Sequence, residues 1–164
     1  MDITRINETT YKVKGKKGVV TVVIGRSVEI MGAVSKSPFP ITQPGEYEVE
    51  GISVFAYQAG KTLATLIQVE EVKVLAIEEP LSDALIEEMD TVDVVLLGTG
   101  AVPSKELVTL VGRIEPSCVV PAGDEASIAA FVKDFEHTSR TSDKLSLSKA
   151  TMATDITDVV VLNS

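Results

Sequence analysis

Histidine and cysteine are almost absent from this sequence, which has 164 residues but only His137 and Cys118 as its single examples. Transition-metal hydrolases need several imidazole, thiolate or carboxylate ligands that converge on one point. A zinc site built on histidines is therefore excluded by number alone. A lone cysteine also excludes an intramolecular disulfide, and its apolar neighbours predict a buried structural thiol rather than a nucleophile.

Tryptophan is absent and aromatic residues make up 4% of the chain, whereas apolar residues make up 45%. The core must therefore consist of valine, isoleucine, leucine and alanine, a composition that favours strands. The formal net charge of −9 argues against a nucleic-acid-binding protein, which needs a cationic face. The lysines between Lys12 and Lys17 are interpreted as solvated residues at a hairpin tip.

Long apolar runs are missing too, since none approaches the roughly 18 residues that a membrane span requires. Residues 1–5 have neither the basic start nor the apolar stretch of a signal peptide. We therefore expect a cytoplasmic protein that binds no membrane. Its length is typical of one domain, which we expect to cover residues 1–164.

Alternating apolar and polar residues predict that the first half of the chain is largely antiparallel β-structure. Prolines and glycines separate the predicted strands, and the proline-rich stretch 37–40 is expected to interrupt pairing. The predicted strands cover residues 11–14, 19–24, 28–31, 46–50, 52–57, 62–69 and 72–77.

The second half alternates strands with helices, which predicts a layered sheet with helices on one face. Ser82, Ser104 and Asp124 are placed to begin three amphipathic helices. Predicted strands cover residues 92–97, 118–121, 144–148 and 158–162, and polar connections cover 139–143 and 148–157. The fold class expected is therefore α/β (α+β), with an antiparallel N-terminal half followed by alternating strands and helices.

Candidate site residues gather where predicted strands end. Carboxylates there suit magnesium or calcium, and backbone N–H groups at a helix start suit an anion, so both alternatives stay open. The glycines have neither the lysine of a P-loop nor the third glycine of a dinucleotide fingerprint. No catalytic residue and no cofactor is predicted. The candidates are Glu78, Glu79, Gly98, Thr99, Gly100, Ala122, Gly123 and Asp124.

The segment PGEYEVEGI at residues 44–52 resembles a motif of small prokaryotic proteins of the metallo-β-lactamase fold, described as zinc-dependent hydrolase-like. The order of the elements is also similar over roughly residues 8–135. The resemblance implies an αββα sandwich with a two-metal site at one edge. It also implies a His-x-His-x-Asp-His segment and further histidine and aspartate ligands.

Almost none of these implied ligands occurs here. The histidine-rich segment expected after Ile24 is absent, the strand-end aspartate falls near Glu78 and Glu79, and the last histidine falls at Ala122 or Gly123. The chain is therefore interpreted as a degenerate member that lacks the metal-binding histidines. A carboxylate-only metal hydrolase and a binder of small anions at the remnant cleft are the alternatives.

The N-terminal half is shorter than the resemblance implies, so part of its helical layer should be missing. An uncovered apolar sheet face normally finds a partner. We therefore expect a catalytically inactive structural or interaction module that forms a homo-oligomer, or binds a protein partner, through the N-terminal sheet.

Overall fold

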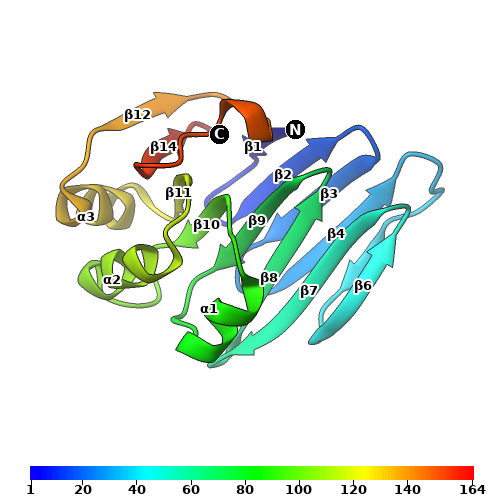
Figure 1. The fold of residues 1–164 in the computed structure, drawn as a ribbon, viewed down its shortest axis with the longest axis horizontal. Helices are drawn as coiled ribbons and strands as arrows, with labels where there is room; N and C mark the ends of the chain where they lie inside the picture. The colour runs from blue at the N-terminus through cyan, green and yellow to red at the C-terminus, as the bar shows by residue number, and fades with distance from the viewer.

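The computed structural model describes all 164 residues and contains two β-sheets and three α-helices (Figure 1). The six-stranded sheet is antiparallel throughout and is built mainly from the first 41 residues. Its spatial order is β13 (Leu145–Ser146), β1 (Asp2–Arg5), β2 (Thr10–Gly15), β3 (Gly18–Val23), β4 (Ser27–Gly32) and β5 (Phe39–Ile41).

The eight-stranded sheet is mixed. Its strands from β6 to β9 pair antiparallel, and the strands from β9 to β12 in the spatial order pair parallel. The spatial order is β12 (Ser139–Ser142), β14 (Asp158–Leu162), β11 (Cys118–Ala122), β10 (Val94–Gly98), β9 (Val72–Ile77), β8 (Thr62–Val69), β7 (Ile52–Ala59) and β6 (Gly45–Val49).

The helices are α1 (Asp83–Met89), α2 (Ser104–Ile114) and α3 (Glu125–Phe135), with a short 3₁₀ turn at Lys149–Thr151. Two begin at side-chain caps, because the Ser82 hydroxyl accepts from the Leu85 N–H at 3.3 Å and Asp124 accepts from the Ser127 N–H at 2.8 Å. None of the three combines the length and the apolar character that a membrane-spanning helix needs.

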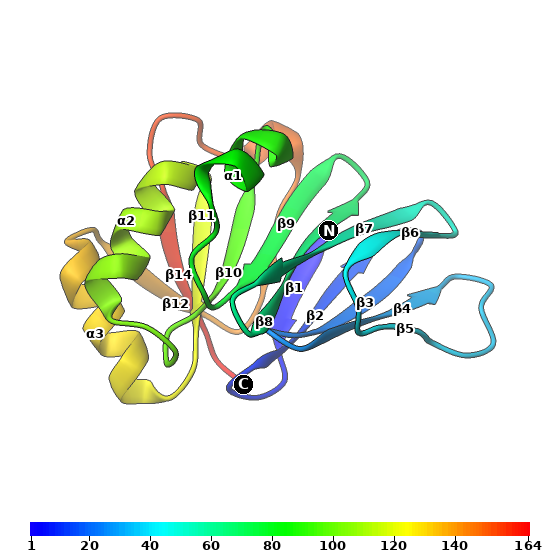
Figure 2. The ribbon, with the colours of Figure 1, turned by 90° about the horizontal axis from the view of Figure 1, so that it is seen from below.

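Figure 2 shows three layers, in which the helices cover one face of the eight-stranded sheet and the six-stranded sheet covers the other. One core of 26 buried residues fills the space between the sheets, and one of 18 lies beneath the helices. No helix covers the outer face of the six-stranded sheet. Its strands consequently alternate, with Tyr11 and Val13 buried and Lys12 and Lys14 exposed.

The predicted α+β class and all three predicted helices are confirmed. Two local expectations were wrong, and one strand was not predicted. Pairing continues through Pro40, because β5 is an edge strand and needs no outward donor. The polar stretch predicted as a connection forms β12, which is also an edge strand and tolerates exposed side chains. Strand β1 was not predicted, since four residues carry too little periodicity.

Asp93 is a buried carboxylate that ties the C-terminal segment to the eight-stranded sheet. It is 7% exposed and accepts from the Lys73 backbone N–H at 2.8 Å. The Lys149 ammonium donates to both its oxygens, at 2.7 and 2.9 Å. Removing the carboxylate would leave the Lys73 N–H and the lysine without their acceptor.

We expect Asp93→Ala to lower the free energy of unfolding by about 2 kcal/mol, because a buried donor loses its partner and Lys149 remains half-exposed. Asp158→Ala is the matched control. Its pair with Arg140 is 42–52% exposed, so its loss should cost less than about 1 kcal/mol. Urea denaturation measures both variants. Equal losses would contradict the assignment of Asp93 as a structural tie.

Candidate functional site

A cleft of about 330 Å³ lies where the parallel strands β9, β10 and β11 end. Open α/β sheets bind ligands at this end of their strands. The structure brings seven of the eight sequence candidates into the lining, and Glu79 is the one outside it. The full lining is Glu8, Thr9, Ile24, Glu78, Gly98, Thr99, Gly100, Ala101, Ala122, Gly123, Asp124 and Ser127.

Thr99 joins the two strand ends that form one wall of the cleft. Its backbone N–H and its hydroxyl both donate to the Ala122 carbonyl, at 2.8 and 2.9 Å. The same hydroxyl lies 2.8 Å from the Ser127 hydroxyl. Gly123 has φ +145° and an added Cβ would lie 2.7 Å from the Thr99 hydroxyl, so only glycine fits there. This wall is therefore tightly packed and hydrogen-bonded.

Glu78 follows β9 and is partly buried beside Gly98, where an added Cβ would lie 2.5 Å from the Glu78 Cβ. Burial raises the pKa of its carboxyl group, and the neighbouring Glu79 carboxylate raises it further, while Arg26 acts in the opposite direction. The Glu78 side chain therefore binds a proton more readily than a solvated glutamate does.

Asp124 is already engaged as the cap of α3. Hydrogen bonds with Ser127 lower the pKa of its carboxyl group, and the bond from the Ser127 backbone N–H contributes more than the Ser127 side chain does. With Glu8 and Glu78 it gives the lining three carboxylates, and no lysine or arginine side chain lines the cleft. This charge opposes the binding of an anion, even though a helix begins at the site.

Several lining residues were missed by the sequence reasoning. Glu8 and Thr9 belong to the loop between β1 and β2 of the other sheet, and no local pattern indicates that this loop reaches the cleft. Arg5 holds the two sheets together nearby, because its guanidinium donates to the Gly123 carbonyl at 2.8 Å. Ser127 could have been found, since it occupies the third position of the helix that Asp124 caps.

The remaining candidates for metal ligands lie elsewhere. His137 follows α3 and its Nδ1 contacts the Phe135 carbonyl at 2.7 Å. Cys118 begins β11, and burial raises the pKa of its thiol to about 12. Glu79 turns toward Gly60, and Asp83 pairs with Arg113.

No group of three or more histidine, cysteine, aspartate or glutamate side chains is arranged to hold a metal ion. The residues present therefore do not fit the zinc pair of the metallo-β-lactamase fold.

The fold is similar to that of solved structures. One is provisionally named a zinc-dependent hydrolase of the metallo-β-lactamase superfamily, from Thermotoga maritima. It superposes with a TM-score of 0.77 and 18% identity, covering 99% of this chain and 100% of its own. The likeness shows that this chain has a metallo-β-lactamase-like fold, in a trimmed form.

A second structure is provisionally named a metal-dependent hydrolase, from Parabacteroides distasonis ATCC 8503. Its TM-score is 0.50 with 8% identity, over 93% of this chain and 97% of its own. No protein-family model and no curated protein matches the sequence.

We expect Glu78→Gln to raise the free energy of unfolding at pH 7. The pKa of Glu78 is higher in the folded than in the unfolded chain, so the folded state loses stability as the pH rises through the unfolded and then the folded pKa. The neutral amide avoids this loss, and the difference should vanish at pH values below both pKa values. Urea denaturation across this range measures it, and a benefit that persists in acid would contradict the interpretation.

Proposed function

We propose that this chain is a non-catalytic interaction domain with a metallo-β-lactamase-like fold, which associates with a second copy of itself. The cleft at the strand ends supports the non-catalytic part of this proposal. It contains no imidazole and no set of metal-binding donors that converges on one point. Without such donors, nothing lowers the pKa of a bound water to make a hydrolytic nucleophile.

The lone histidine supports the same conclusion by its position. His137 lies after the C-terminus of α3, whereas Asp124 at the start of α3 lies in the cleft. One helix therefore separates the only imidazole from the strand ends. The carboxylate-only alternative rests on Glu8, Glu78 and Asp124, of which Asp124 already caps the helix.

The surface proposed for association is the uncovered outer face of the six-stranded sheet, centred on β3. Across this face Lys12 pairs with Thr21 and Thr21 with Glu29, so lysine, threonine and glutamate form one row. The next row contains Lys14, Val19 and Met31 in the same order. Positive charge thus lies along β2, negative charge on β4, and half-buried neutral residues along β3 between them.

This arrangement is self-complementary about a two-fold axis. Rotation about an axis parallel to β3 places β2 of one copy opposite β4 of its partner and keeps each row in line. Lys12 then faces Glu29 of the other copy, twice per dimer, and Thr21 meets its own equivalent on the axis. An isologous interface requires this kind of matching, and opposite charges fix its register.

We expect the purified chain to bind no stoichiometric zinc after incubation with excess metal and desalting, because its donors do not converge. Inductively coupled plasma mass spectrometry measures the retained metal, with magnesium and calcium assayed by calorimetry. One divalent ion per chain that Glu78→Gln removes would overturn the proposal in favour of a carboxylate-bound metal. Glu87→Gln, an exposed substitution on α1, is the matched control.

We expect the chain to form a dimer whose dissociation constant rises at least about tenfold in Lys12→Glu, because both symmetric charge pairs become repulsive. The double variant Lys12→Glu/Glu29→Lys should restore dimerisation, since the swap recreates both pairs. Sedimentation equilibrium measures all three proteins. A strict monomer at high concentration, or a dimer indifferent to Lys12→Glu, would refute this interface.

A further inference from the structure

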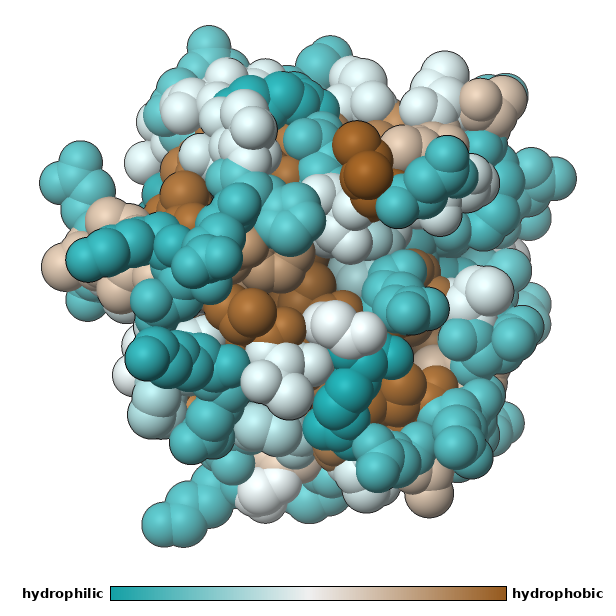
Figure 3. Space-filling model, turned by 60° about the vertical axis from the view of Figure 1, so that its left-hand side comes forward, coloured by the Kyte–Doolittle hydropathy of each residue, from teal (hydrophilic) through white to brown (hydrophobic).

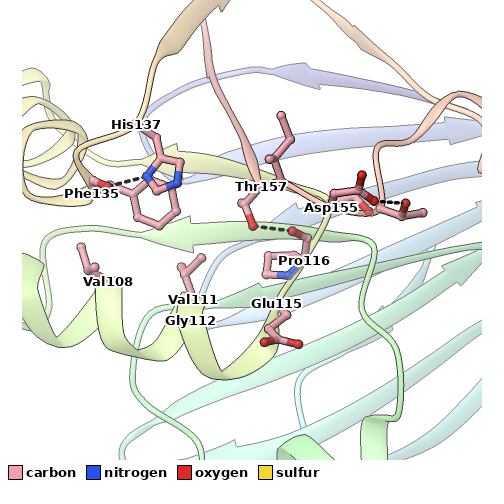
Figure 4. A pocket seen from close by; sticks show the side chains of 12 residues that line it. Val108, Val111, Gly112, Glu115, Pro116, Phe135, His137, Asp155 and Thr157 are labelled. Carbon is pink, nitrogen blue, oxygen red and sulfur yellow. Dashed lines mark hydrogen bonds between the residues drawn. The ribbon is translucent and has the colours of Figure 1, made fainter.

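A second, larger cavity of about 580 Å³ lies at the opposite end of the parallel strands from the cleft. It is bounded by α2, the residues after α3, and the segment that enters β14 (Figure 4). No residue of this cavity lines the cleft, so the two are separate sites. Its main wall residues are Val108, Val111, Glu115, Phe135, His137 and Asp155.

One wall is apolar and well supported from behind. Val111 and Phe135 belong to the buried core beneath the helices. The Phe135 ring stacks on Phe131 with 5.5 Å between centroids, and the His137 ring centroid lies 4.5 Å from that of Phe135. Figure 3, which brings the helix side forward, shows apolar surface between polar side chains on this side of the molecule. An apolar group can therefore be buried here without rearranging the core.

The polar part of the lining is negative. Glu115 and Asp155 are its charged side chains, and it contains no lysine or arginine. Helices α2 and α3 both end at this cavity, at caps Glu115 and Glu136 that adopt the left-handed conformation. The partial negative charges of two helix C-termini thus add to the two carboxylates. The cavity favours a cation.

His137 adds a hydrogen-bond acceptor. Its Nδ1 lies 2.7 Å from the Phe135 carbonyl oxygen, which can only accept, so Nδ1 carries the hydrogen. In the neutral ring Nε2 is then an acceptor. Figure 4 shows this second nitrogen turned away from the Phe135 carbonyl, on the side of Thr157.

We propose that this cavity binds a cationic amine carried on an apolar stem, such as an arylalkyl- or alkylammonium group. The stem packs on Val108, Val111 and Phe135, while the carboxylates of Glu115 and Asp155, which lie on different sides of the cavity (Figure 4), attract the ammonium by their charge. The site needs neither the dimer nor the cleft, so it stands independently of the proposed function.

The test is titration of the ¹⁵N-labelled chain with 2-phenylethylammonium, followed by backbone amide shifts. Its isosteres of neutral and negative charge, 2-phenylethanol and 3-phenylpropionate, are titrated in parallel. We expect saturable shifts confined to the cavity, with 3-phenylpropionate at least about tenfold weaker because its charge is repelled. A parallel titration with Nα-acetyl-lysine amide shows whether a free arylalkylamine or a protein lysine side chain binds more tightly.

The double variant Glu115→Gln/Asp155→Asn should weaken amine binding about fivefold or more, because both exposed carboxylates become neutral. Glu87→Gln, which removes an exposed carboxylate far from the lining residues in sequence, should leave it unchanged. Circular dichroism confirms that each variant is folded. Equal affinity for all three isosteres, no saturable shift, or full binding by the double variant would overturn the proposal.

Discussion

The eight-stranded sheet must bury two apolar faces at once, and this requirement organises the rest of the molecule. Its central strands β10 and β11 are buried at every residue. One face is covered by the six-stranded sheet and the other by the three helices. The six-stranded sheet has no comparable demand, because the outward residues of β2 and β4 include Lys12, Lys14 and Glu29, which are exposed. The six-stranded sheet therefore needs no further layer over its outer face.

This difference between the two sheets bears on how a trimmed metallo-β-lactamase-like fold persists. The outer surface of the N-terminal sheet carries separated charges around half-buried β3 residues. Polar side chains let such a face contact water, and we propose that its charge pattern orients a second copy. A fold does not by itself fix a function, so the chemistry of particular sites decides what this chain can do.

Local signals in the sequence sufficed for most of the fold. Ser82 and Asp124 marked helix starts because a side-chain acceptor at that position satisfies free N–H groups. The sequence did not predict how the antiparallel strands divide between the two sheets. The alternating pattern indicates which face of each strand is buried, but it does not indicate which strands pair with each other. Two strands, β1 and the edge strand that contains Pro40, were not predicted for the same reason. Each forms by pairing with its neighbour rather than from a pattern in its own sequence.

The lining of the cleft was likewise predictable only where it depends on local sequence. Thr99, Gly123 and Asp124 were found because strand ends and helix starts are readable locally. Glu8 was not predicted as a lining residue, because its loop belongs to the six-stranded sheet. That sheet is held near the cleft by the hydrogen bond from Arg5 to the Gly123 carbonyl. Charge in the cleft therefore reflects tertiary contacts that no single segment specifies. The larger cavity was missed altogether, since its walls come from α2, α3 and the segment before β14.

Helix α3 is the element that both cavities share. Ser127 in its first turn lines the cleft, and Phe135 at its end lines the larger cavity. Eleven residues of α-helix form a rod about 16 Å long. Because this one helix supplies a wall residue at each end, the two cavities lie about one helix length apart.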